Sequence, residues 1–97
     1  MSDTTIKVEQ IKSRLSVPAF AAPMFLISGP DLVIAACKAG VIGSFPTLNA
    51  RPVEVLEQWF RRITTELQDT DAPWAANLIV HKSNQRFAPD FDLIQKY

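Results

Sequence analysis

The sequence predicts an α/β protein in which short strands of a parallel sheet alternate with helices. Three short apolar runs lack polar alternation, which is typical of strands buried on both faces of a parallel sheet. Each run is followed by a segment with helical spacing or helix-capping residues. The 97 residues, 47% of them hydrophobic, suffice for one small domain, and we expect residues 1–97 to form it.

The first predicted strand covers residues 17–22, an apolar run that Pro23 ends. Residues typical of helix boundaries bracket the next segment and predict a helix over 30–39. These are a proline at the first helical position, an acid in the first turn, a base in the last turn and a glycine just beyond it, at Pro30, Asp31, Lys38 and Gly40. The helix interior is apolar nearly all round, so we expect it to pack deeply.

A second buried strand is predicted over 40–46, ending at Pro46, and a helix over 52–68. This helix has the clearest amphipathic pattern of the chain. Its apolar positions are spaced by four, three and four residues at Leu56, Phe60, Ile63 and Leu67. Residues 69–73 then form a turn that ends in a proline.

Residues 74–80 predict a third strand, which one polar residue, Asn77, interrupts. Residues 81–86 form a polar loop, and residues 89–97 predict a last helix with Asp90 near its start. The order is therefore three successive strand–helix units with parallel strands.

Three parallel strands alone leave two open edges and uncovered apolar surface. A (β/α)8 TIM barrel uses about 250 residues, so 97 residues correspond to about three of its eight units. The predicted fold class is therefore the N-terminal three units of a truncated TIM barrel. A small open three-stranded α/β domain, or a fragment completed by partner chains, stays open as an alternative.

Composition excludes several classes of protein. Ten Lys and Arg balance ten Asp and Glu, which disfavours a dedicated nucleic-acid binder. The longest apolar run, residues 17–27, has 11 residues, too few to span a membrane, and the acidic N-terminus does not resemble a signal peptide. A single cysteine, Cys37, excludes an internal disulfide and a multi-cysteine metal site. We expect a cytoplasmic protein without a metal, with Cys37 as a small buried hydrophobe.

Candidate site residues lie where the predicted strands end, because active sites of such folds occupy that edge. Met24 follows the first strand, either as a filler of the core or rim or as a site residue. Asn49 follows the second strand, as a turn or cap residue or as a ligand. Asn77 needs partners for its amide if it lies in an apolar strand. His81 is the only imidazole, a general base or a solvated loop residue.

Three segments, residues 21–25 (AAPMF), 28–51 (SGPDLVIAACKAGVIGSFPTLNAR) and 77–84 (NLIVHKSN), resemble the nitronate monooxygenase family, formerly called 2-nitropropane dioxygenases. The likeness extends from about Leu15 to the last residue, Tyr97. It implies that this chain is the N-terminal portion of an FMN-dependent (β/α)8 barrel. Members of that family oxidise alkyl nitronates with dioxygen, so the resemblance implies a small-molecule substrate and dioxygen as partners.

The resemblance also implies the roles of particular residues. Pro23 and Met24 match the first-strand turn whose backbone passes beside the flavin, Ala22 lines the ring more loosely, and Asn77 matches an asparagine that contacts the flavin. It places Asn49 and His81 near the site without assigning them a role.

The catalytic histidine of the family and its glycine-rich phosphate loops lie in later strands. The resemblance therefore places them beyond Tyr97, outside this sequence. We expect no catalytic residue among residues 1–97 and no activity from this portion alone.

Two departures and several alternatives accompany this resemblance. Ala21 precedes the turn where many members have glutamine, and Phe25 and Leu26 follow it where many have glycine. These residues predict a bulkier pocket and a substrate other than a small nitronate.

Three alternative functions stay open: a flavin-dependent enoyl-thioester reductase of the same fold, a tRNA dihydrouridine synthase and a non-catalytic truncated product. The neutral charge disfavours the tRNA dihydrouridine synthase. Formation of a homo-oligomer also stays open.

Overall fold

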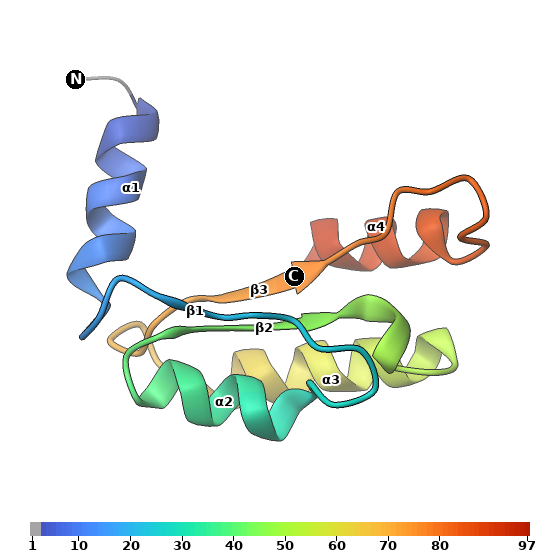
Figure 1. The fold of residues 1–97 in the computed structure, drawn as a ribbon, viewed down its shortest axis with the longest axis horizontal. Helices are drawn as coiled ribbons and strands as arrows, with labels where there is room; N and C mark the ends of the chain where they lie inside the picture. The colour runs from blue at the N-terminus through green and yellow to red at the C-terminus, as the bar shows by residue number, and fades with distance from the viewer. Residues whose placement is uncertain (1–2) are drawn as a thin grey trace.

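A computed structural model describes residues 3–97, which form a mixed α/β fold with a parallel sheet and four α-helices (Figure 1). The predicted α/β class and the parallel strands are thereby confirmed. The elements, in chain order, are α1 (Asp3–Ser13), β1 (Phe20–Ala21), α2 (Pro30–Lys38), β2 (Ile42–Pro46), the 3-10 helix η1 (Thr47–Asn49), α3 (Val53–Glu66), β3 (Trp74–Asn77) and α4 (Phe87–Lys96).

The strands lie in the sheet in their chain order, β1-β2-β3. Phe20 of β1 pairs with Ile42 of β2, and β2 pairs with β3 as far as Pro46 and Asn77. Because both pairings are parallel, all three strands end at the same edge of the sheet. We call it the carboxyl edge, and it lies at Ala21, Pro46 and Asn77.

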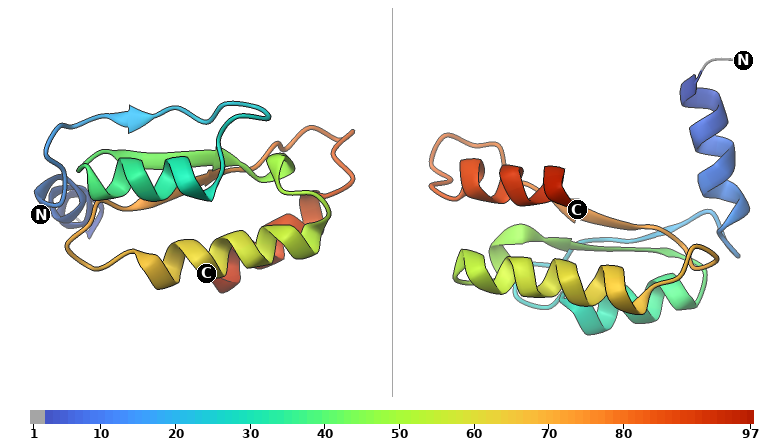
Figure 2. Two further views of the ribbon diagram at one scale, coloured as in Figure 1. Left: turned by 90° about the horizontal axis from the view of Figure 1, so that it is seen from below. Right: turned by 180° about the vertical axis from the view of Figure 1, so that it is seen from behind.

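One face of the sheet carries the hydrophobic core. The Phe45 ring lies 5.5 Å from the Trp59 ring and 5.8 Å from the Phe60 ring, both of α3. Both views of Figure 2 show α2 and α3 along this same side of the sheet. The stripe predicted for the helix after β2 is buried here at Leu56, Phe60 and Ile63. Val33 and Cys37 of α2 complete the centre of the core.

The other face of the sheet is exposed at its outer strands β1 and β3, whereas the β2 residues on it are buried, and we call it the open face. Since side chains alternate along a strand, Phe20, Ser44 and Asn77 belong to this face, opposite Phe45. Helix α1 stands against it near the beginning of the strands (Figure 1). Phe20 is nevertheless 68% exposed. In the part of the chain that the structure describes, no helix is both long enough and apolar enough to cross a membrane.

The extent of all three strands differs from the prediction, that of β2 only in its start at Ile42 instead of residue 40. The first strand covers only Phe20–Ala21 instead of 17–22, and its burial on both faces was wrong, since Phe20 is exposed. The Ala19 amide donates to the carbonyl of Val17 at 2.8 Å, whereas the Ala19 carbonyl accepts a hydrogen bond from Ile42 of β2 at 3.1 Å, so regular pairing with β2 starts only at Phe20. The third strand ends at Asn77 instead of residue 80, because its partner β2 ends at Pro46.

Helices were predicted more closely. The bounds of α2 and α3 differ from the predicted ranges 30–39 and 52–68 by one or two residues. Helix α4 begins at Phe87 instead of residue 89 and ends at Lys96, so Tyr97 caps the helix instead of continuing it. Helix α1 was not predicted. Its residues 4–13 are exposed, so no periodic apolar stripe marks it in the sequence.

A substitution of Gly43 tests how closely α2 approaches the sheet. A Cβ atom at Gly43 would lie 2.5–3.0 Å from main-chain atoms of Val33 in α2. We expect Gly43→Ala to lower the free energy of unfolding by about 2–3 kcal/mol, because the helix must move away from β2. Urea unfolding followed by circular dichroism measures this loss.

Gly29→Ala is the matched control, since a Cβ there meets only the Trp59 ring at 3.7 Å, an ordinary contact. Gly29 is the N-cap of α2, where alanine is less favourable than glycine, so we expect its free energy of unfolding to fall by no more than about 1 kcal/mol. Equal losses for the two variants would contradict the close approach of α2 to β2.

Candidate functional site at the carboxyl edge

The structure brings the predicted site segments to one edge of the sheet. Ala22, Pro23 and Met24 form the start of the loop that follows β1, and all three are exposed. Asn49 ends η1, directly after β2, and Asn77 is the last residue of β3. Strand β2 lies between the other two strands, and Asn49, which follows it, contacts the loop of Met24.

Asn49 holds the β1–α2 loop through its side-chain amide. Its Oδ1 accepts a hydrogen bond from the amide of Leu26 at 2.8 Å. Its Nδ2 donates to the carbonyls of Met24 at 2.9 Å and Ser28 at 2.8 Å. Both amide hydrogens of Asn49 are therefore engaged within the protein. This arrangement corresponds to the turn-forming role weighed for Asn49, and its amide has no free donor for a ligand.

Ser28 closes the same loop from the other side. It is buried, and its hydroxyl accepts a hydrogen bond from the Met24 amide at 2.8 Å. The Ser28 amide donates in turn to the Met24 carbonyl at 2.9 Å. Five hydrogen bonds thus converge on three residues of the loop, so its main chain has a defined conformation.

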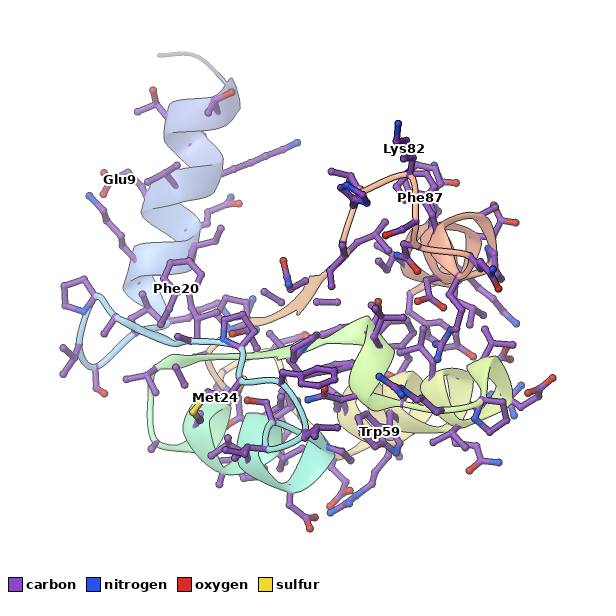
Figure 3. The ribbon with its side chains drawn as sticks, turned by 45° about the vertical axis from the view of Figure 1, so that its right-hand side comes forward. Glu9, Phe20, Met24, Trp59, Lys82 and Phe87 are labelled. Carbon is purple, nitrogen blue, oxygen red and sulfur yellow. The ribbon has the colours of Figure 1, made fainter. Side chains whose placement is uncertain are left out.

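The tip of this loop is apolar and projects into solvent. Leu26 has a positive φ of 65° and is 73% exposed, and Phe25 and Ile27 beside it are exposed as well. The Arg51 guanidinium lies 5.6 Å from the centre of the Phe25 ring. In Figure 3 the Met24 side chain lies on the α2 side of β1, whereas Phe20 lies on the α1 side. Met24 therefore does not share the open face with Phe20.

The side-chain amide of Asn77, in contrast to that of Asn49, is not engaged by described residues. Its partner in the sheet is Pro46, and its neighbour Ala76 packs against the core, so alternation puts Asn77 on the open face. The residue is exposed, and no described residue hydrogen-bonds to its side chain. Asn77 therefore does not lie within an apolar core strand, because α1 stands against the open face only near the beginning of the strands and leaves the carboxyl edge uncovered at Asn77. Its carboxamide is available to a ligand.

His81 lies in the exposed loop after β3, at the same edge. Its Nδ1 accepts a hydrogen bond from the Ser83 amide at 3.1 Å and lies 2.7 Å from the Ser83 hydroxyl. Because Nδ1 accepts from a main-chain N–H, the proton of the neutral ring is on Nε2. This local turn and its exposure fit the solvated loop residue weighed for His81.

Tyr97 contacts α3 instead of the candidate site. The resemblance places the catalytic histidine of the family beyond this residue. Its ring lies 5.8 Å from the Phe60 ring, at a tilt of 44°. Its hydroxyl accepts a hydrogen bond from Nε of Arg61 at 3.1 Å and donates to Oε1 of Glu57 at 3.4 Å. These contacts hold the end of α4 against α3, so Tyr97 has a packing role and none at the carboxyl edge.

Cys37 is buried as predicted. Its Sγ lies 3.4 Å from the Pro73 carbonyl, and burial raises the pKa of its thiol. A raised pKa disfavours the thiolate, so Cys37 is unsuited to be a nucleophile. Among the described residues, no group of three His, Cys, Asp or Glu side chains could hold a metal ion.

Sequence reasoning missed a buried ion pair that anchors η1. Arg86 bonds Oδ1 of Asp90 through Nε at 3.1 Å and Nη2 at 2.8 Å, and Asp90 is fully buried. Arg86 also donates from Nη1 to the Ala50 carbonyl and from Nη2 to the Thr47 carbonyl at 3.5 Å. The i,i+4 spacing of Arg86 and Asp90 was the available signal, but such pairs usually lie on helix surfaces.

An apolar cleft lies away from this edge. It has a volume of about 350 Å³ between α1 and the beginning of the sheet, where Phe20 and Ile42 start their strands. Ile11 and Leu15 of the N-terminal region form its other wall, with Lys12 at the side. None of the predicted site residues lines it, so we place the candidate site at the carboxyl edge.

Comparison with known proteins does not assign a function to the residues at the carboxyl edge. The chain matches no family model, no curated protein and no solved structure. What can be assigned to the carboxyl edge therefore comes from its own residues.

Arg86 provides a test of the anchor at this edge. We expect Arg86→Lys to lower the free energy of unfolding by about 1–3 kcal/mol, because a compact ammonium lacks the planar fork with which the guanidinium reaches Asp90 and two carbonyls at the same time. Arg62→Lys is the control, since Arg62 forms exposed ion pairs with Asp31 and Glu66 and should change the free energy by less than about 0.5 kcal/mol. Urea titration compares the two, and an equally small change for Arg86→Lys would rule out a stabilising anchor.

Proposed function

We propose that this chain is the flavin-contacting N-terminal portion of an FMN-dependent (β/α)8 barrel that oxidises alkyl nitronates with dioxygen. The proposal starts from the three segments that resemble nitronate monooxygenases. It is supported by the sequential strand order β1-β2-β3 and by the packing of α2 and α3 on one face of the sheet. In such barrels the strands follow one another around the barrel and the helices cover the outside.

The open face suits a sheet that continues into further strands. Phe20 is exposed on it, and within residues 3–97 both β1 and β3 have one unpaired edge. Parallel sheets are normally covered on both faces, and unpaired edges are normally protected. In the proposed barrel the open face would become the inner wall, and further strands would pair with β1 and β3.

The observation that carries the cofactor proposal is the free carboxamide of Asn77 at the carboxyl edge. A carboxamide offers a donor and an acceptor, which complement the pyrimidine edge of an isoalloxazine ring. Ala22 and Pro23 are exposed across β2 and could flank the same ring. Bound FMN would supply the electron transfer between nitronate and dioxygen, and these residues would orient one edge of it.

This portion of the proposed barrel would lack the groups for two tasks. Catalytic proton transfer and phosphate binding would be supplied by segments beyond Tyr97, with His81 near the site but without an assigned role. The neutral composition and the single buried Cys37 are compatible with a cytoplasmic protein. Association with a second copy is a further property to measure.

A flavin-dependent enoyl-thioester reductase is the second candidate. The exposed apolar loop tip of Phe25, Leu26 and Ile27 favours it, because such side chains could contact an acyl chain. A reductase would take electrons from a reduced nicotinamide, whereas a nitronate oxidase would take them from its substrate. Anaerobic bleaching of the flavin by NADPH or by a nitronate in the complete barrel distinguishes these functions.

Asn77→Ala tests the flavin contact. We expect the purified chain to quench the fluorescence of added FMN, and Asn77→Ala to raise the dissociation constant about fivefold to tenfold, as expected for loss of one hydrogen bond. Gln58→Ala is the control, since it removes an exposed carboxamide on α3, and its dissociation constant should equal that of the unmodified chain.

Two results would count against the proposal. Absence of quenching at millimolar chain would remove the cofactor assignment for this portion. Equal dissociation constants for Asn77→Ala and Gln58→Ala would remove Asn77 from the flavin contact.

A further inference from the structure

We infer that Asn49 is a positioning residue that fixes the β1–α2 loop, residues 22–29, in one conformation before any ligand binds. The inference concerns the same edge as the proposed flavin site, and its functional part rests on that proposal. Its structural part depends only on the contacts of Asn49 and can be tested without a cofactor.

The first argument is the hydrogen bonding of the Asn49 side chain. It reaches from η1 to a loop more than 20 residues earlier and bonds the Leu26 amide and the carbonyls of Met24 and Ser28. These three hydrogen bonds require one acceptor and two donors at fixed angles, which a carboxamide provides. Neither an aspartate, which lacks donors, nor an alanine can replace it.

The second argument is the conformation of Leu26. Its φ of 65° lies in the left-handed region, which a leucine rarely adopts unless its surroundings hold it there. The Leu26 side chain is 73% exposed, so packing does not hold it. The bond from its amide to Asn49 Oδ1 is the side-chain contact that does.

The third argument is that Asn49 itself is anchored. Arg86 bonds the carbonyls of Thr47 and Ala50, which flank Asn49 in the chain. Arg86 is in turn held by the buried Asp90 of α4. The β1–α2 loop and the start of α4 are therefore connected through η1, so the loop takes its position from the rigid part of the fold. A loop fixed in advance binds a ligand without paying for its own ordering.

Amide hydrogen exchange tests the structural part. We expect the Leu26 amide to exchange at least about tenfold faster in Asn49→Ala than in the unmodified chain, because its acceptor is gone. The amide of Ile63 in the core should keep its rate, which shows that the fold is intact. Gln58→Ala is the control and should leave the Leu26 amide unchanged.

Asn49→Asp is the second variant and serves if Asn49→Ala fails to fold. It keeps the acceptor for Leu26 but loses both donors and places a carboxylate beside the carbonyls of Met24 and Ser28. We expect protection of Leu26 to fall about tenfold here too, because the loop loses two of its bonds to Asn49. Unchanged Leu26 exchange in a folded Asn49 variant would overturn the inference.

Titration with FMN tests the functional part on the same variants. We expect the dissociation constant of a folded Asn49 variant to rise about tenfold or more, with Ile63 exchange unchanged, because binding must then order the loop. Faster Leu26 exchange with no FMN binding by the unmodified chain would retain the positioning role and reject the proposed flavin site. Faster Leu26 exchange with an unchanged dissociation constant would reject only the link between the loop and FMN.

Discussion

The arrangement of the carboxyl edge depends on the four residues from Thr47 to Ala50. This short segment bonds in two directions, to the β1–α2 loop through Asn49 and to α4 through Arg86. Strand β2, from which the segment continues, is the central strand and is buried throughout. The segment thus connects both neighbouring loops to the rigid core through hydrogen bonds.

Such an anchor has a cost that the surrounding bonds must offset. Burying the Asp90 carboxylate and most of Arg86 removes both charges from water, and an ion pair alone rarely compensates for that. Here Arg86 also bonds the carbonyls of Thr47 and Ala50, two groups that would otherwise lose water without gaining a partner. The ion pair by itself therefore adds little, and the stability expected of the anchor comes from the bonds of Arg86 to the two carbonyls, which also fix the position of η1.

The parts of the fold that were predicted from sequence depend on local patterns. The apolar spacing of Leu56, Phe60 and Ile63 is a property of one helix, and it identified α3 within two residues. The extent of a strand depends on its partner, so the end of β3 at Asn77 could not be read from its own apolar run. The bonds of Asn49 join residues at separations of 21 to 25, and no local signal reveals them.

Asn49 and Asn77 show why residue type alone could not assign the site. Both follow or end a strand at the same edge, and from sequence either could have been a ligand. In the structure the amide hydrogens of Asn49 are engaged by two carbonyls, whereas no described residue bonds the Asn77 side chain. A carboxamide can serve a ligand only with donors and acceptors that the protein has not already used. That criterion separates the residue that shapes this edge from the residue that is free to bind at it.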